Sequence, residues 1–363
     1  MRLLAPAGVL AALAAGLVAP AFAAGAVITV NSTGDWAPTP ADVADCLQGT
    51  NTCTLRAAIA GANQAAGPET IQFAPSVTGT IALTQGTLTV TDDLAIQGPG
   101  ASALAIDGSA GVSDGIIQDQ ASTLTVSGLT LQNGTSSDSP LDQRGGAIQR
   151  LAGDLTVSGV TFSGNTSGGG NDGGAIEADA GTLVTIADSS FTSNQAGVGA
   201  AIELWSGDLS VSSSTFTQNT ASGDGAAIDA QSGGTVTISG THLTSNVGGA
   251  IRAQGTLDLS NSVIESNTAP DYAGVGAQTG YLLSVTITGN TVTDTAFACE
   301  SDNGCTAGLS LWGGAVTNST IVANNPQAPT QVPTPNCLFL GAVTDGGGNT
   351  VGSDCTFGVA GAG

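Results

Sequence analysis

The sequence contains no lysine and has very little positive charge of any kind. Its 363 residues include five Lys or Arg, all of them Arg, against 28 Asp and Glu, which gives a formal net charge of −23. Nucleic acids and anionic membrane surfaces are bound through clusters of Lys and Arg. The composition therefore argues against nucleic acid as a partner, and it disfavours attachment to an anionic membrane surface.

Aromatic residues are also scarce. They make up 4% of the chain, whereas glycine alone accounts for 54 residues. A bulky globular core is disfavoured by such a composition, which suits many short strands joined by tight turns. The apolar fraction of 41% is nevertheless too high for a disordered chain.

The first 23 residues have the features of an export signal. Arg2 supplies positive charge, residues 3–18 are apolar, and Ala21-Phe22-Ala23 has the small-x-small pattern of a cleavage site. A membrane helix is the alternative, but the apolar stretch is short for a span and no stop-transfer charges follow it. We expect residues 1–23 to be removed and the mature chain to be secreted or held at the cell surface of a bacterium, without insertion into the membrane.

The cysteines fall into three local pairs. In an exported protein, an even number of cysteines indicates disulfides rather than thiol chemistry. Several pairing schemes are open, and pairing of nearest neighbours would join Cys46 to Cys53, Cys299 to Cys305 and Cys337 to Cys355. A zinc site is disfavoured, because the chain has no C-x-x-C motif and His242 is its single histidine.

An internal repeat of about 26 residues occupies the middle of the chain. Its units begin with Gly-Gly-Ala-Ile or Gly-Ala-Ala-Ile, at Gly145, Gly173, Gly199, Gly225 and Gly248. Each unit continues with an alternating run, such as Leu209-Ser-Val211, and then with a second run that closes on asparagine. The clearest closing runs are Phe-x-x-Asn at 162–165, 191–194 and 216–219, and weaker copies end at Asn246, Asn267, Asn290 and Asn324.

Alternation with a period of two predicts strands with one apolar face, and the Gly, Ser and Asp clusters between them predict turns. One unit cannot bury its own apolar face, whereas stacked units bury a continuous core. The sequence therefore predicts an all-β, right-handed parallel β-helix with about ten coils over residues 76–325. We expect Phe162, Phe191 and Phe216 to stack inside it. Each repeated asparagine is expected to adopt the left-handed conformation and to bond to its counterpart in the next coil.

Both ends of such a stack need a cover. Residues 24–75 are the predicted N-terminal cap, with one helix candidate over residues 53–59, in which Thr54 is the N-cap and Leu55 and Ile59 share a face. Residues 326–363, a Pro-rich stretch followed by the cysteine-bounded segment 337–355, are expected to close the C-terminal end.

These motifs resemble those of two groups of bacterial β-helix proteins. The Gly-Gly-Ala-Ile and Phe-x-x-Asn pair is similar to the repeats of the polymorphic outer-membrane proteins, which are autotransporter adhesins. Cys53-Thr-Leu-Arg-Ala-Ala-Ile59, followed by Asn63 and Thr70-Ile-Gln-Phe73, resembles the CSLREA motif that begins many secreted bacterial β-helix proteins, although Ala57 stands where that motif usually has Glu. The resemblance implies a secreted or surface β-helix and indicates no ligand.

An acidic column is the best candidate for chemistry. The residue after each Gly-Ala-Ile or Ala-Ala-Ile is, in successive units, Gln149, Glu177, Glu203, Asp229 and Arg252. Because the Ile side chain points inward, we expect this position to point outward, with neighbouring carboxylates about 5 Å apart. That spacing would suit a retaining glycosidase pair or a cation such as calcium. A solvated face of an acidic protein is the simpler interpretation, and we favour it.

A second outward column runs beside the first and consists of Asp179, Trp205, Gln231 and Gln254. Trp205 is placed to stack on a sugar ring. Cleavage of acidic polyuronates is disfavoured, since only Arg252 and Arg150 could neutralise sugar carboxylates and the net charge repels such polymers. His242 occupies a position that is Ser, Thr or Val in other units, and it precedes Leu243, which aligns with the inward phenylalanines, so we expect His242 on the surface.

The sequence thus favours a non-catalytic extracellular or cell-surface protein that contributes adhesion or recognition of a glycan or a protein along its flat faces. The alternative is a carbohydrate-active enzyme, a polysaccharide hydrolase or lyase, that uses Glu177, Glu203 and Asp229. The candidate ligand-binding residues are Trp205, Glu203 and Arg252. Calcium is the one metal that the pattern suggests, and no other cofactor is expected.

Overall fold

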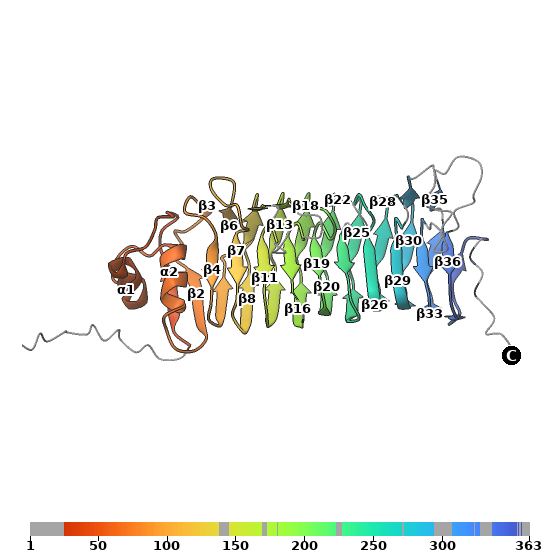
Figure 1. The fold of residues 1–363 in the computed structure, drawn as a ribbon, viewed down its shortest axis with the longest axis horizontal. Helices are drawn as coiled ribbons and strands as arrows, with labels where there is room; N and C mark the ends of the chain where they lie inside the picture. Colours follow the sequence, from red (N-terminus) through yellow and green to blue (C-terminus); the bar gives the residue numbers. More distant parts are fainter. Residues whose placement is uncertain are drawn as a thin grey trace, which may run out of the picture.

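The protein is an elongated stack of parallel β-coils. The computed structural model describes residues 25–137, 145–168, 173–179, 181–222, 227–270, 272–293, 307–322, 324–326, 336–353, 355 and 357. Figure 1 shows the strands of successive coils side by side along one long axis, in sequence order, with both helices at the N-terminal end. The strands of all three ladders pair in parallel, which confirms the all-β parallel β-helix.

Two ladders of strands form one bent sheet. The first ladder contains β4 (Leu88–Val90), β7 (Ile117–Asp119), β11 (Ile148–Arg150), β15 (Ile176–Ala178), β19 (Ile202–Leu204), β23 (Ile228–Ala230), β32 (Leu309–Leu311) and β36 (Cys337–Phe339). The second contains β1 (Val27–Val30), β2 (Glu69–Phe73), β5 (Leu94–Gln97), β8 (Thr123–Ser127), β12 (Asp154–Ser158), β16 (Thr182–Ala187), β20 (Gly207–Ser212), β24 (Thr235–Ser239), β33 (Gly314–Thr317) and β37 (Val343–Asp345). The long strands β26 (Ile251–Ser260) and β29 (Val275–Leu283) belong to both ladders, so they join them.

A separate 11-stranded sheet forms the third ladder. It contains β3 (Gly79–Ala82), β6 (Leu104–Asp107), β9 (Thr130–Gln132), β13 (Thr161–Ser163), β17 (Ser190–Thr192), β21 (Thr215–Thr217), β25 (His242–Thr244), β27 (Val263–Glu265), β30 (Thr286–Thr288), β34 (Thr320–Val322) and β38 (Thr350–Val351). Two-residue strands follow it in two short sheets: β10 (Thr135–Ser136), β14 (Thr166–Ser167), β18 (Gln195–Ala196) and β22 (Thr220–Ala221), then β28 (Thr268–Ala269), β31 (Thr291–Val292) and β35 (Asn325–Pro326).

The ladders extend beyond the predicted coil region of residues 76–325. Strands β1 and β2 precede it, and β36 to β38 follow it, so the N-terminal cap and the C-terminal segment each contribute coil strands. Residues 1–23, the predicted export signal, lie outside the described residues. Neither helix in the described part of the chain has the length and apolar character to cross a membrane.

The interior is filled mainly by aliphatic and aromatic side chains, because alternate residues of each strand point inward. In the third ladder, Phe162, Phe191 and Phe216 are fully buried and stack with ring centroids 4.6 Å apart. The predicted phenylalanine stack is therefore confirmed.

An asparagine ladder runs beside the phenylalanine stack. It consists of Asn165, Asn194, Asn219, Asn246, Asn267, Asn290 and Asn324, all of them buried. From Asn165 to Asn290, each Nδ2 donates to the Oδ1 of the next asparagine at 2.8 to 3.0 Å. Each Nδ2 also donates to a main-chain carbonyl of the preceding coil at 3.0 to 3.2 Å. The predicted bonding between counterparts is confirmed.

The predicted left-handed conformation of these asparagines is wrong. The residue before the asparagine adopts it instead, with φ of 64° at Gly164, 57° at Ser193 and 57° at Gln218. The left-handed residue turns the chain at the corner, and the asparagine that follows it is then free to direct its amide along the stack. Asparagine was expected to make the left-handed turn because it tolerates that conformation, but the residue before each asparagine makes the turn.

Two helices cover the N-terminal end, whereas the sequence predicted one. The predicted helix is α2 (Leu55–Ala62), and the Thr54 hydroxyl accepts a hydrogen bond from the Ala57 amide at 3.1 Å, as expected. The additional helix is α1 (Pro40–Gln48), which begins with a capping box formed by Thr39 and Asp42. Its signal was in the sequence, since Thr-Pro-x-Asp combines an N-cap, proline at the first helical position and an acidic third residue.

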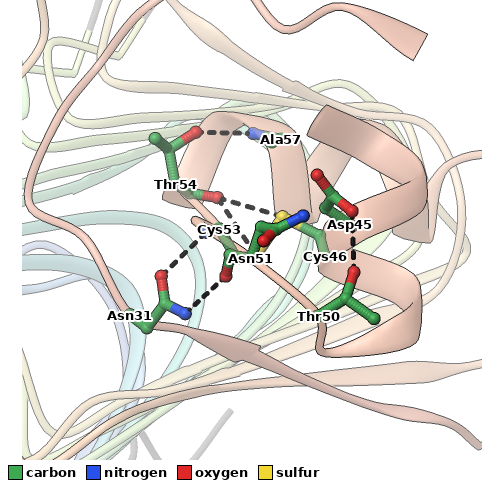
Figure 2. The surroundings of a disulfide bond; sticks show 8 residues. All are labelled: Asn31, Asp45, Cys46, Thr50, Asn51, Cys53, Thr54 and Ala57. Atoms are coloured by element: carbon green, nitrogen blue, oxygen red, sulfur yellow. Dashed lines mark hydrogen bonds between the residues drawn. A yellow bond between two sulfur atoms is a disulfide. The ribbon is translucent and has the colours of Figure 1, made fainter. Parts of the chain in front are cut away.

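A disulfide joins the two helices. Cys46, near the end of α1, is bonded to Cys53, just before α2, and their Cα atoms lie 4.7 Å apart. Figure 2 shows Asn31 beside this bond, where its Oδ1 accepts from the Cys53 amide and its Nδ2 donates to the Asn51 carbonyl, both at 2.8 Å. Asn31 directly follows β1, so the disulfide loop is fixed to the first strand of the stack.

At the other end, Cys337 and Cys355 form the second predicted disulfide, with a Cα separation of 4.8 Å. Two of the three predicted pairs are therefore confirmed. The third pair, Cys299 and Cys305, lies outside the described residues.

Arg56, in α2, connects the N-terminal cap to the first coil. Its guanidinium donates to both carboxylate oxygens of Asp35, at 2.7 and 3.2 Å. It also donates to the carbonyls of Gly86 and Thr87, at 2.6 and 2.9 Å, directly before β4. Arg56 therefore has a structural role that the sequence did not predict.

Candidate binding face

The acidic column, which we define as Glu177, Glu203 and Asp229, lies on the outer side of the first ladder. Glu177 pairs in register with Glu203, and Glu203 with Asp229. Gln149 precedes the column and Arg252 follows it, also in register. Successive members are therefore one strand spacing apart, about 4.8 Å between main chains, and the predicted alignment is confirmed.

The column is buried, which corrects the expectation of an exposed and solvated face. Glu177, Glu203 and Asp229 are each 0% exposed. The described turns that begin at Gly173 and Gly199 lie against Glu177 and Glu203, and the Gly173 amide donates to Glu177 Oε2 at 2.8 Å. A Cβ on Gly173 would lie 2.0 Å from the Ile176 carbonyl oxygen, and one on Gly199 would lie 2.8 Å from the Cβ of Glu203. Alternation gave the direction of the side chains correctly, but it contained no information about the turn above them.

Side chains from the neighbouring column supply donors to the carboxylates. Gln231 Nε2 donates to Glu203 Oε1 at 2.8 Å and to Asp229 Oδ2 at 3.2 Å. Arg252, whose side chain is one-third exposed, lies with Nη1 3.5 Å from the same Asp229 oxygen. Glu203 and Arg252, two of the predicted ligand-binding residues, are thus engaged with other parts of the protein.

Arg150 does not lie on this face, contrary to expectation. It is the third residue of β11, so alternation directs it to the interior, where it is fully buried. Its Nη1 bonds to Asp119 Oδ2, and its Nη2 donates to the Ser122 carbonyl at 3.0 Å. Burial lowers the pKa of Arg150 to about 10, which leaves the guanidinium charged at neutral pH. Arg150 is therefore not available to a ligand.

The second predicted outward column is exposed in part. We define the ridge as Asp179, Trp205, Gln231, Gln254, Gln278 and Trp312, each of which directly follows a strand position of the first ladder. The Trp205 amide donates to the Ala178 carbonyl at 3.0 Å, and the Trp312 amide to the Ala277 carbonyl at 3.3 Å. These equivalent bonds place both tryptophans at the same position of their coils.

Exposure differs along the ridge. Trp205 is 38% exposed and Trp312 is 52% exposed, while Gln254 and Gln278 also face solvent. Asp179 is half-buried, and this burial raises its pKa to about 6. Sequence reasoning had missed Gln278 and Trp312, although alignment of Leu309-Ser-Leu311 with the Ile-x-Ala strands of the repeat would have found the tryptophan.

A metal site finds no support in the described part of the chain, which contains no group of three His, Cys, Asp or Glu placed to hold an ion. The calcium option therefore gains nothing from the acidic column. The other acidic loop, between Cys299 and Cys305, lies outside the described residues. His242 is exposed on the third ladder, as predicted.

Comparison with known protein families shows the handedness of the β-helix and the family to which the chain belongs. The model of the family described as the right-handed beta helix region matches residues 81–256 and 152–326. The chain belongs to the right-handed β-helix family. Comparison with curated proteins found no match. Membership of the right-handed β-helix family supports a surface or carbohydrate-related protein in general, and it does not distinguish adhesion from catalysis.

Proposed function

We propose that the protein is a non-catalytic extracellular or cell-surface protein that recognises a glycan or another protein along the outer side of the first ladder. The observation that carries the proposal is the complete burial of Glu177, Glu203 and Asp229. A glycosidase acid and nucleophile must both reach the glycosidic bond. These carboxylates instead bond to the protein itself, while the ridge beside them is open to solvent.

Two further observations support an extracellular location. The sequence begins with the features of an export signal, and disulfides join Cys46 to Cys53 and Cys337 to Cys355. Disulfides form and persist in oxidising compartments. The resemblance to secreted and surface β-helix proteins points in the same direction, and adhesion is the role that the polymorphic outer-membrane proteins have in common.

The test compares binding with turnover. The exported chain is incubated with a broad polysaccharide panel and with extracellular proteins, and both retention and reducing-sugar release are measured. We expect retention of a partner without sugar release. The matched control is the triple variant E177Q/E203Q/D229N, which should retain the same partner. Sugar release by the wild type that the triple variant lacks would identify the protein as an enzyme and contradict the proposal.

A further inference from the structure

The tryptophans of this protein lie on its surface. The chain has three Trp, and Trp36, Trp205 and Trp312 are 39%, 38% and 52% exposed, whereas Phe162, Phe191 and Phe216 are fully buried. Large exposed aromatic side chains mark interaction sites more often than isolated exposed aliphatic ones do. Two of the three tryptophans share the ridge, and this arrangement requires an explanation.

We propose that the ridge from Trp205 to Trp312 binds an extended, neutral polysaccharide, with an indole ring at each end of the site. This inference rests on the proposed recognition function and specifies its ligand and its residues. The argument depends on the spacing of the two tryptophans, on the side chains between them and on the charge around them.

The spacing suits a chain rather than a single sugar. Gln231, Gln254 and Gln278 occupy the ridge position in the three coils between Trp205 and Trp312, as the registers of β19, β23, β26, β29 and β32 show. Four steps of about 4.8 Å separate the tryptophans by about 19 Å along the stack. Because the coils are straight and parallel, a ligand that contacts both rings must itself be extended.

The side chains between the rings suit sugar hydroxyls. An amide offers both a donor and an acceptor, as a hydroxyl does, and the exposed Gln278 presents such groups to solvent, while the Gln254 amide is held by the Gln231 carbonyl at 2.7 Å and by Arg252 Nη2 at 3.0 Å. Gln231 is held in place by its bonds to Glu203 and Asp229, so this part of the ridge is ordered before a ligand arrives. The indole faces would cover the apolar faces of sugar rings.

The charge around the ridge selects a neutral ligand. Asp179 precedes Trp205 on the ridge, the acidic column lies directly beside it, and the Arg252 guanidinium is already placed against Asp229. With a net charge of −23, the protein repels acidic polymers. A protein partner is disfavoured because stable protein interfaces bury about 800 Å² on each side, and the ridge is one residue wide in each coil.

The test measures affinity for soluble neutral polysaccharides, namely a β-glucan, a mannan and a xylan, with polygalacturonate and alginate as acidic probes. The wild type should bind at least one neutral probe and neither acidic one. Trp205→Ala and Trp312→Ala should each weaken that binding about thirtyfold, which corresponds to the loss of about 2 kcal/mol that a tryptophan hot spot contributes. Trp36→Ala is the matched control, because Trp36 is as exposed as Trp205 and lies at the N-terminal cap, and it should change the affinity by less than about twofold.

Ligands of different chain length distinguish binding to one indole ring from binding across both rings. An oligosaccharide shorter than the ridge can contact only one ring, so the wild type should bind two copies, and either single variant should bind one with unchanged affinity. A polymer that spans both rings should lose affinity in either variant. The conservative variants Trp205→Phe and Trp312→Phe retain an aromatic face and should keep most of the binding, while circular dichroism and the melting temperature confirm that each variant is folded.

Unchanged polymer binding in both alanine variants would place the site elsewhere and overturn the inference, while the proposed recognition function would stand. Failure to bind any neutral probe would overturn it as well, as would binding only of acidic polymers or of a protein. Sugar release that depends on Glu177, Glu203 and Asp229 would instead overturn the proposed function itself.

Discussion

Two buried columns of polar side chains run along the stack, and they satisfy their hydrogen bonds in different ways. In the asparagine ladder, the side-chain amide of one asparagine donates to the next amide and to a carbonyl of the preceding coil. The asparagines therefore supply hydrogen-bond donors to one another. In the acidic column, the donors to the carboxylates include three groups that do not belong to the column, namely the Gly173 amide, Gln231 and Arg252.

The difference follows from the chemistry of the two groups. An amide carries both donors and an acceptor, whereas an ionised carboxylate only accepts. Asparagine can therefore repeat indefinitely at one position of a coil, but a column of carboxylates requires a covering turn or a basic neighbour at each step. The asparagine ladder belongs to the scaffold alone, while the acidic column couples the scaffold to the turns and to the ridge above it.

The largest expected effect lies beside the asparagine ladder. Phe191→Ala removes the central ring of a fully buried stack and should lower the free energy of unfolding by about 3–5 kcal/mol, the usual cost of emptying a core aromatic site. Urea denaturation measures the loss, and Trp205→Ala serves as a control that should cost less than about 1 kcal/mol because its ring is exposed. A loss below about 1 kcal/mol for Phe191→Ala would contradict the buried stack.

Exchange of amide and carboxylate between the two columns tests the comparison directly. Asn219→Asp replaces an Nδ2 that donates to the Phe191 carbonyl and to Asn246 Oδ1 with an acceptor, so it should cost about 3 kcal/mol at neutral pH. Glu203→Gln keeps an acceptor for Gln231 and removes one charge from the column, so it should cost less than about 1 kcal/mol.

Both variants are measured by the same urea denaturation at two pH values. The defect of Asn219→Asp should shrink in acid, because a protonated carboxyl regains one donor. Equal losses of unfolding free energy in Asn219→Asp and Glu203→Gln would contradict the proposed difference in hydrogen bonding between the two columns.

The covering turn is tested by a glycine pair. Gly173→Ala places a Cβ 2.0 Å from the Ile176 carbonyl oxygen, and it should cost about 1–3 kcal/mol through overpacking. Gly313→Ala is the matched control, since its nearest neighbour would lie 3.8 Å away, and it should be neutral or stabilising by up to about 1 kcal/mol. Thermal denaturation compares the Gly173→Ala and Gly313→Ala variants. Equal melting temperatures would show that the turn at Gly173 is not tightly packed.

The smallest expected effect is the pH response of the ridge. Burial raises the pKa of Asp179 to about 6, above its ordinary value of 3.8. Folding therefore favours the protonated form, so the contribution of this group to stability is present below about pH 4 and is lost as the pH rises through about 6. Asp179→Asn removes the titration, so the wild type should lose melting temperature relative to this variant between pH 4 and 7. A difference between the two proteins that is constant over that range would contradict the assignment to Asp179.

Several features that depend on one strand and its repetition could be predicted from the sequence. The period of two placed the phenylalanines inside, the common position of the asparagines paired them across coils, and the local cysteine pairs at 46–53 and 337–355 close short loops. Thr54 could be recognised as an N-cap because capping involves residues only three apart. The physical reason is that these features are set within a strand, a turn or one coil step.

Only the fold buried the acidic column and paired Arg150 with Asp119 of the preceding coil. Each depends on the path of a turn or on coils that lie far apart in sequence, and residue alternation specifies only whether a side chain leaves one side of a strand or the other. The sequence directed Glu203 outward, but only the fold placed the Gly199 turn above it. The most exposed side chains of this face are those of the ridge, namely Trp205, Gln254, Gln278 and Trp312.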